Sequence, residues 1–172
     1  MKRKFKTSEL VICAILVACH IILSRFLSIN AWHTKIGFTF VPVLIAAYVF
    51  GPVLAGIVGG LGDLIGALAF PIGAYFPGFT FTCFLTGVIY GVFFYNKSEK
   101  QMALNIPVAV IINQIVCSLI LNTLWISILY GSSFKVLLAT RSVQAGIMTA
   151  VEIVVMLALV KVLPKFKEMI KK

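Results

Sequence analysis

The sequence predicts an all-α membrane protein in which six transmembrane helices form a single integral-membrane domain over residues 1–172. The chain is 61% hydrophobic and its mean hydropathy is +1.09, whereas soluble domains are roughly 45–50% apolar. Because a membrane-spanning helix needs roughly 20 apolar residues, the 172 residues have room for five or six such helices and short loops. No polar stretch is long enough to form a separate soluble domain.

The charged residues predict which way the chain crosses the membrane. The chain has 15 basic residues (Lys and Arg) and 5 acidic residues (Asp and Glu), which gives a formal net charge of +10. On a soluble protein this excess would indicate nucleic acid as a partner, but here the basic residues gather at the chain ends and loops. Six spans put both termini on the side with most of the Lys and Arg, so the positive-inside rule places both termini in the cytoplasm. We expect the lipid bilayer, and not nucleic acid, as a partner.

The first span is predicted over residues 8–27. A secretory signal peptide is the alternative, but the apolar run has no small-residue cleavage site and contains His20 and Arg25. Ala14 and Ala18 lie four residues apart and make a smooth patch that another helix can approach closely. By itself such a pair is also typical of ordinary packing within a bundle.

A loop over residues 28–35 and a short span over residues 37–50 follow. Trp32 and His33 in the loop are typical of side chains that anchor a helix at the lipid headgroups. A tight turn at residues 51–52 then leads directly into the third span.

The third span, residues 53–70, combines small residues with one acid. The small residues recur on one helical face, at Ala55, Gly59, Gly62 and Gly66. Such a face lets a helix pack closely at the centre of a bundle. Asp63 lies at the border of this face, so we expect it to point into protein and to have a partner. The sequence leaves two roles for this carboxylate: it caps a polar group of a neighbouring helix, or it binds a ligand.

A rigid aromatic turn over residues 70–80 connects the third span to the fourth, which is predicted over residues 79–94. Two prolines and two glycines make the turn rigid. Its aromatic residues offer flat faces on which a ring can lie, and they are Phe70, Tyr75, Phe76 and Phe79.

The last two spans each carry a polar stripe. The fifth is predicted over residues 106–130, after a polar loop at 95–105, and its stripe consists of Gln114, Ser118, Asn122 and Trp125. A loop over residues 131–140 precedes the sixth span at 142–163, whose stripe consists of Arg141, Gln144, Met148 and Glu152. Polar stripes in lipid must face protein or a cavity. We expect Pro164 to end the sixth span before a basic tail.

These side chains are predicted to converge on a pocket that opens to the outside beneath the loops. The predicted topology places several polar and aromatic groups in the outer part of their helices, namely Arg25, Asp63, Asn122, Trp125, Arg141 and Gln144. The basic residues favour an anionic ligand, because arginine can bind a carboxylate through two parallel hydrogen bonds. Aromatic faces favour a flat ring, and one acid suits an amino-substituted heterocycle with adjacent N–H donors.

Two motifs carry a resemblance to a known family: GDLIGALAFPIGAYFPGFT at residues 62–80 and LYGSSFKVLLATRSVQ at residues 129–144. The Ala14–Ala18 pair of the first span also matches. With these motifs the whole chain resembles the membrane-embedded S components of energy-coupling-factor (ECF) vitamin transporters, and among them the folate-specific ones.

The resemblance implies a high-affinity folate-binding subunit that captures folate outside the cell and delivers it inward. It implies a partner complex of a transmembrane coupling subunit and two cytoplasmic ATPases, with ATP used only by those partners and no cofactor in this chain. It also implies a location in the plasma membrane of a prokaryote, and that Ala14 and Ala18 form the docking surface for the coupling subunit.

The resemblance also assigns residues to the ligand. Asp63 would bind the pterin ring, and Asn122 and Trp125 would line the pocket floor. Arg141 and Gln144 would contact the polar end or the amide, with Arg25 a weaker candidate because it lies on the Ala14–Ala18 face. The ring-binding wall and gate would be formed by Phe70, Tyr75, Phe76, Pro77, Gly78 and Phe79.

Three other functions are alternatives to folate transport. An S component for another vitamin belongs to the same class, although thiamine would require more acids than bases in the outer half. An enzyme is not expected, because no HExxH or GxSxG motif is present and the two intramembrane acids lie at different depths. A non-transport structural or assembly protein would not need the cluster of polar residues.

Overall fold

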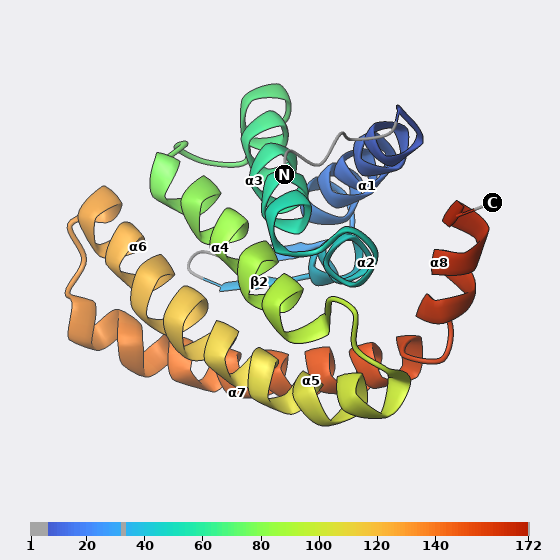
Figure 1. The fold of residues 1–172 in the computed structure, drawn as a ribbon. Coiled ribbons are helices and arrows are strands. Elements are labelled where there is room, and N and C mark those ends of the chain that lie inside the picture. The colour runs from blue at the N-terminus through green and yellow to red at the C-terminus, as the bar shows by residue number, and fades with distance from the viewer. Residues whose placement is uncertain (1–6, 32–33, 172) are drawn as a thin grey trace.

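The structure is a computed structural model that describes residues 7–31 and 34–171. Trp32, His33 and the basic residues among positions 1–6, on which part of the sequence analysis rests, lie outside the described residues. The described part of the chain is helical apart from one short hairpin, so the predicted helical class is confirmed (Figure 1).

The elements follow one another along the chain with short connections. In order they are α1 (Thr7–Arg25), β1 (Ile29–Ala31), β2 (Thr34–Ile36), α2 (Phe40–Phe50), α3 (Pro52–Ala69), α4 (Pro77–Phe94), α5 (Glu99–Asn113), the π-helix η1 (Gln114–Asn122), α6 (Thr123–Tyr130), α7 (Phe134–Leu159) and α8 (Leu163–Lys171). The two strands pair antiparallel, with Ile29 opposite Ile36, in a segment that was predicted to be loop.

Within residues 7–31 and 34–171, five helical segments are long and apolar enough to cross a membrane. They are α1, α3, α4, the continuous run α5–η1–α6 and α7. The remaining predicted span, the second one at residues 37–50, corresponds to α2, which has 11 residues. At about 1.5 Å per residue, α2 is roughly half as long as the ~30 Å hydrocarbon core of a bilayer.

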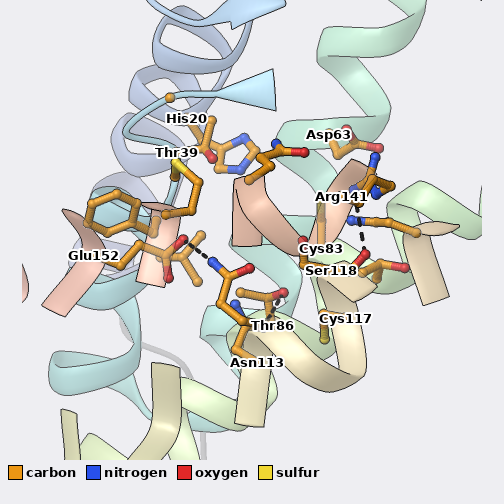
Figure 2. Close-up of a pocket in the computed structure, with 18 residues that line it drawn as sticks. His20, Thr39, Asp63, Cys83, Thr86, Asn113, Cys117, Ser118, Arg141 and Glu152 are labelled. Carbon is orange, nitrogen blue, oxygen red and sulfur yellow. Dashed lines mark hydrogen bonds between the residues drawn. The ribbon is translucent and has the colours of Figure 1, made fainter. Parts of the chain in front are cut away.

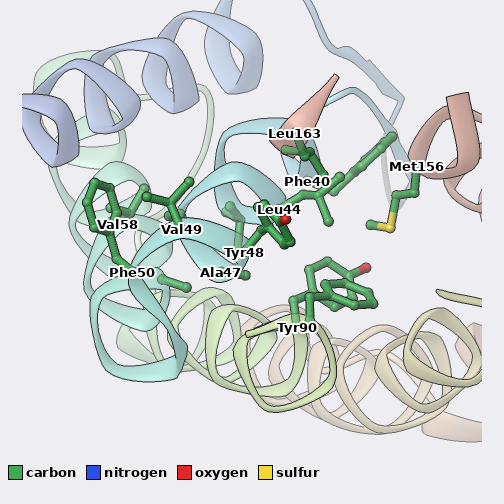
Figure 3. Close-up of a cluster of buried hydrophobic side chains, with 14 of the residues drawn as sticks. Phe40, Leu44, Ala47, Tyr48, Val49, Phe50, Val58, Tyr90, Met156 and Leu163 are labelled. Carbon is green, nitrogen blue, oxygen red and sulfur yellow. The ribbon is translucent and has the colours of Figure 1, made fainter. Parts of the chain in front are cut away.

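Helix α2 forms the centre of the apolar core. Almost all of its side chains are buried, as expected for a helix that is hydrophobic on every face. Leu44 of α2 packs in one cluster with Val58 of α3, Tyr90 of α4 and Met156 of α7 (Figure 3). The bundle is therefore arranged around a short helix that has other helices, rather than lipid, on most of its sides.

The predicted small-residue face of α3 is confirmed as a close helix contact. A Cβ added at Gly59 would lie 2.5 Å from the backbone oxygen of Cys83 on α4, and one at Gly62 would lie 2.5 Å from the His20 ring on α1. Without those side chains, α3 packs directly against both neighbours (Figure 1).

Three predicted helix starts were wrong, because α4, α5 and α7 each begin inside a segment that was predicted as loop. Helix α5 begins at Glu99, since the Ser98 hydroxyl accepts a hydrogen bond from the Gln101 amide in a capping box. Helix α7 begins at Phe134, so the loop after α6 contains only residues 131–133. Helix α4 begins at Pro77, because proline has no N–H and so removes one of the first-turn amides that lack a helical partner.

The end of the last span also differs from the prediction. Helix α7 ends at Leu159, and Pro164 lies in the first turn of α8 instead of terminating a span. A proline in a first turn removes an amide that has no helical partner, so it is compatible with starting a helix. The basic C-terminal residues therefore form a helix where a tail was expected.

Candidate functional site

Two cavities lie between the helices, and both are lined by Asp63, Cys83 and Asn122. The first is also lined by Glu152, is called the Glu152 cavity below and has a volume of about 190 Å³. The second is also lined by Tyr75, is called the Tyr75 cavity below and has a volume of about 240 Å³. Each alone is smaller than the ~300–1,000 Å³ typical of small-molecule sites, whereas their combined volume falls within that range. The shared residues make the two cavities neighbours.

The Glu152 cavity is lined by both predicted polar stripes. All four residues of the α7 stripe line it, namely Arg141, Gln144, Met148 and Glu152. From the other stripe, Gln114, Ser118 and Asn122 line it. These three lie within η1, where each turn is wider than in an α-helix, so residues four apart stay on nearly the same side. The prediction that the stripes face protein or a cavity is confirmed, since the remaining stripe residue, Trp125, packs against Phe76.

A chain of hydrogen bonds forms the floor of the Glu152 cavity. The Tyr90 hydroxyl donates to Oε2 of Glu152 at 2.9 Å, and Nε2 of Gln114 donates to Oε1 at 3.1 Å. The Asn113 amide donates to the Tyr90 oxygen at 3.1 Å and accepts from Thr86 at 2.9 Å. Side chains from α4 and η1 thus bond both oxygens of one buried carboxylate on α7.

Arg141 brings a positive charge into the wall of the same cavity. Its side chain is buried, at 6% exposure, and its Nη2 donates to the Ser118 carbonyl at 3.5 Å. Because α7 begins at Phe134, Arg141 is fixed within a helix and not in a loop. Figure 2 places Arg141 and Glu152 on opposite sides of the cavity.

Asp63 lies where the two cavities meet and points into protein, as predicted. Its Oδ2 accepts a hydrogen bond from the Thr80 hydroxyl at 2.9 Å, and its Oδ1 lies 3.7 Å from Nη2 of Arg25. The Thr80 hydroxyl is also within 3.2 Å of the Tyr75 hydroxyl. Asp63 therefore connects α1, the turn before α4 and α4 itself.

Arg25 lines the Tyr75 cavity, although its position in the sequence placed it on the same face of α1 as Ala14 and Ala18. It lies at the last turn of α1, where its long side chain reaches across to α3. Its guanidinium group pairs with Asp63, so the structure brings these two predicted site residues together.

Only part of the predicted aromatic wall lines a cavity. Tyr75, Phe76 and Phe79 line the Tyr75 cavity. Phe70 lies outside both cavities: it is 47% exposed, and its ring packs edge-on against Phe26 with 5.3 Å between centroids.

Trp125, Pro77 and Gly78 lie behind the Tyr75 cavity and do not line it. The Trp125 ring centroid is 5.6 Å from that of Phe76, and its indole N–H donates to the Thr82 hydroxyl at 3.0 Å. A Cβ at Gly78 would lie 2.5 Å from the Trp125 ring, so the glycine is what lets the indole approach α4. Trp125 thus supports the wall that Phe76 forms.

The structure adds cavity residues that sequence reasoning had not assigned to the site. They are His20, Gly37, Thr39, Phe40, Val43, Ala67, Ile72, Gly73, Ala74, Thr82, Cys83, Thr86, Asn113, Gln114, Cys117, Ser118, Met148 and Glu152. A signal was available for Asn113, Gln114 and Glu152, since polar groups within apolar spans are commonly functional. No such signal marks Thr82 or Cys83, because small neutral residues are ordinary in membrane helices.

The Ala14–Ala18 pair lies on an exposed face of α1. Neither residue packs within the bundle of described residues, so ordinary internal packing does not account for the pair. Among the described residues, no group of three His, Cys, Asp or Glu side chains is placed to bind a metal ion.

The comparisons with known proteins all match vitamin transporters. A family model described as the S component of an ECF-type riboflavin transporter matches residues 4–165. A folate transporter, FolT, from Clostridium novyi (strain NT) is 42% identical over 166 residues, covering 96% of this chain and 95% of the relative. A folate transporter FolT from Leuconostoc mesenteroides subsp. mesenteroides is 29% identical over 155 residues, covering 87% and 83%.

Solved structures agree with these sequence relatives. A crystal structure of FolT bound with folic acid has a TM-score of 0.83 and 31% identity, and covers 90% of this chain and 92% of that one. The structure of the S component of a bacterial ECF transporter has a TM-score of 0.70 and 28% identity, covering 92% and 96%. The relatives are transport proteins and not enzymes, as expected for this chain. The chain therefore belongs to the family of S components of ECF-type transporters.

Proposed function

We propose that this chain is the folate-binding S component of an ECF-type importer. One observation carries the proposal: two neighbouring cavities that share three lining residues bring together an aromatic wall, two arginines and two carboxylates. Folate has a flat amino-substituted ring at one end and carboxylates at the other, so its chemistry matches these lining groups. The similarity to a FolT structure that contains folic acid supports the same ligand.

Riboflavin is the second candidate, because the matching family model is described by that vitamin. Riboflavin also has a flat fused ring but carries no carboxylate. The buried Arg141 and the Arg25 side chain favour an anionic ligand over a neutral one. The arginines therefore support folate as the better match.

Binding to purified protein tests this proposal. The detergent-solubilised chain should bind folic acid with 1:1 stoichiometry by isothermal titration calorimetry, in the absence of ATP. Riboflavin and thiamine should bind much more weakly under the same conditions. Tight riboflavin or thiamine binding together with no folic acid binding would assign the chain to another vitamin.

In this proposal the chain works with a transmembrane coupling subunit and two cytoplasmic ATPases, which alone use ATP. The chain itself needs no cofactor. It captures folate on the outer side of a prokaryotic plasma membrane and delivers it inward with the coupling subunit. The exposed Ala14–Ala18 face of α1 is where the coupling subunit would dock.

The proposed topology has six spans and both termini in the cytoplasm. The short helix α2 together with the β1–β2 hairpin would complete the second crossing. Fusing a reporter that is active only in the cytoplasm to each terminus in turn tests this topology. Activity from both fusions is expected, and activity from only one terminus would mean an odd number of crossings.

A further inference from the structure

We infer that the end of the bundle that carries α8 binds the headgroups of anionic phospholipids. The binding surface, called the basic end surface below, consists of four exposed lysines. They are Lys97 and Lys100 at the connection between α4 and α5, Lys161 in the turn between α7 and α8, and Lys165 in α8. None of the four lines either cavity, so this inference goes beyond vitamin binding and does not depend on it.

Helix α8 is held against the bundle by two of its side chains. Leu163, at its start, is 2% exposed and belongs to the apolar core cluster. About one turn later, Nζ of Lys167 lies 4.9 Å from the ring centroid of Tyr48 and 5.7 Å from that of Tyr95, within the range of a cation–π contact. The same amine donates to Oδ1 of Asn96 at 3.4 Å. Helix α8 therefore has a defined place beside the connection between α4 and α5.

This placement turns the outer side of α8 away from the bundle. Lys165 is two residues from both Leu163 and Lys167, so the 3.6-residue repeat puts it on the opposite side of the helix, and it is exposed. Lys161, in the turn before α8, is also exposed. Figure 1 shows α8 turning away from the direction of α7 at the end of the bundle where α4 connects to α5.

Basic side chains outnumber acidic ones at this end of the bundle. Residues 95–100 and 161–168 together contain five lysines and two glutamates, Glu99 and Glu168. Lys167 contacts the aromatic rings, and the other four lysines are exposed. An ammonium group binds phosphate as a point charge. The basic end surface is therefore complementary in charge to lipid phosphates.

The four lysines lie where the lipid-facing surface of the bundle ends. Val154 and Leu157 are exposed apolar side chains near the end of α7, and Lys161 follows about one turn later. On the other side, Val92 is 62% exposed before the polar connection between α4 and α5, and Leu104 is 76% exposed after it. Lysines next to lipid-facing apolar side chains reach the headgroups. This continuity with the lipid-facing surface favours a lipid over an acidic protein.

The positive-inside rule explains only part of this arrangement. The rule accounts for the side of the membrane on which lysines lie, but it does not require a helix that is folded against the end of the bundle. In the proposed topology this end faces the cytoplasmic leaflet, which carries anionic lipids. A helix with lysines on its outer side binds such a surface by electrostatic attraction. Helix α8 thus attaches this end of the chain to the inner leaflet.

Lipid retention measured by native mass spectrometry tests the inference. Detergent-solubilised protein is incubated with equal amounts of phosphatidylglycerol and phosphatidylcholine. Wild-type protein should retain phosphatidylglycerol about threefold or more over phosphatidylcholine, because each lysine near a headgroup adds to the attraction. Replacing all four lysines of the basic end surface with glutamine should reduce the preference to about 1.5-fold or less. Lys135 is the control, since it is exposed near the start of α7, and Lys135→Gln should lower the preference less than Lys165→Gln does.

A local probe then locates the lipid on the protein. A tryptophan is introduced at Val162, next to Lys161, or at Val136, next to Lys135, in a chain whose two native tryptophans are replaced by phenylalanine. The two valines are 53% and 64% exposed. In mixed vesicles of the two lipids, brominated phosphatidylglycerol should quench Val162→Trp about twofold more than brominated phosphatidylcholine, because the anionic lipid is enriched there. Val136→Trp should be quenched equally by both.

Three results would each overturn the inference. They are equal retention of the two lipids by wild-type protein, a full preference in the variant that lacks the four lysines, and equal effects of Lys165→Gln and Lys135→Gln. Equal quenching of Val162→Trp by the two brominated lipids would do the same. The retention measurement keeps the native tryptophans, so it decides the question even if the tryptophan-free chain does not fold. Folic acid binding should be unchanged in the variant that lacks the four lysines, so failure here leaves the proposed function standing.

Discussion

Nη2 of Arg25, at the end of α1, lies 3.7 Å from Oδ1 of Asp63 in α3 and donates to the Asp63 carbonyl at 3.5 Å. The two side chains are only 11% and 13% exposed. The absence of a side chain at Gly66 makes room for this contact, because a Cβ there would lie 3.0 Å from Nε of Arg25. With little water to screen the charges, the pair fixes α1 relative to α3 at the edge of the Tyr75 cavity.

A double-mutant cycle should reveal this coupling. Arg25→Met and Asp63→Asn should each lower the free energy of unfolding by roughly 1–3 kcal/mol, because each leaves a poorly solvated polar group without its partner. The double variant should lose less than the two single losses combined, with a coupling of about 1 kcal/mol or more. Thermal unfolding of the detergent-solubilised variants measures this, and strictly additive losses would mean that the pair contributes nothing.

The contact between α3 and α4 should not tolerate a side chain at Gly59. Gly59→Ala places a Cβ 2.5 Å from the Cys83 carbonyl oxygen, so the helices must separate. We expect a loss of about 1–3 kcal/mol, typical of overpacking. Gly146→Ala is the matched control, since nothing lies within 4 Å of its added Cβ. The control should be neutral or stabilising by up to about 1 kcal/mol, and equal effects at both sites would argue against close packing.

Trp125 should report on ligand binding through its fluorescence. The chain has two tryptophans, so the Trp32→Phe variant isolates Trp125. Its ring packs against Phe76, which lines the Tyr75 cavity. A ligand there should change the Trp125 emission in proportion to occupancy. An emission that stays constant while calorimetry detects binding would place the ligand away from Phe76.

Arg141 should contribute directly to anion binding. Arg141→Ala removes a buried charge from the wall of the Glu152 cavity and should weaken folic acid binding by about 1–3 kcal/mol, the range for hydrogen bonds to charged groups. Lys135 is a suitable control because it is a cation on the same helix with an exposed side chain. Lys135→Ala should leave the dissociation constant unchanged. An unchanged affinity in Arg141→Ala would remove that residue from the site.

The exposed face of α1 should matter for transport and not for binding. Ala14→Leu combined with Ala18→Leu should leave folic acid affinity unchanged and abolish uptake in cells that contain the coupling subunits, because bulk prevents close helix approach. The matched control is Ala139→Leu with Ala150→Leu, two exposed positions on α7. The control should transport normally. Loss of binding in the α1 variant would mean that this face belongs to the bundle.

Much of the site followed from periodicity in the sequence. The polar stripes of η1 and α7 and the small-residue face of α3 each have a helical repeat, and the structure turns each of them inward. Helix ends were predicted less well, because Ser98 and Pro77 extend helices into segments whose composition is typical of loops. Capping is local chemistry that a composition average does not detect.

The sequence by itself determined that this chain is helical, belongs in a membrane and carries a few inward-facing polar groups, since these properties depend on composition and on the 3.6-residue repeat. Tertiary structure alone decided how those groups are paired. Arg25 meets Asp63 across 38 positions, and Gln114 meets Glu152 across the same separation. Such long-range contacts depend on how the helices pack around α2, and no local pattern in the sequence specifies them.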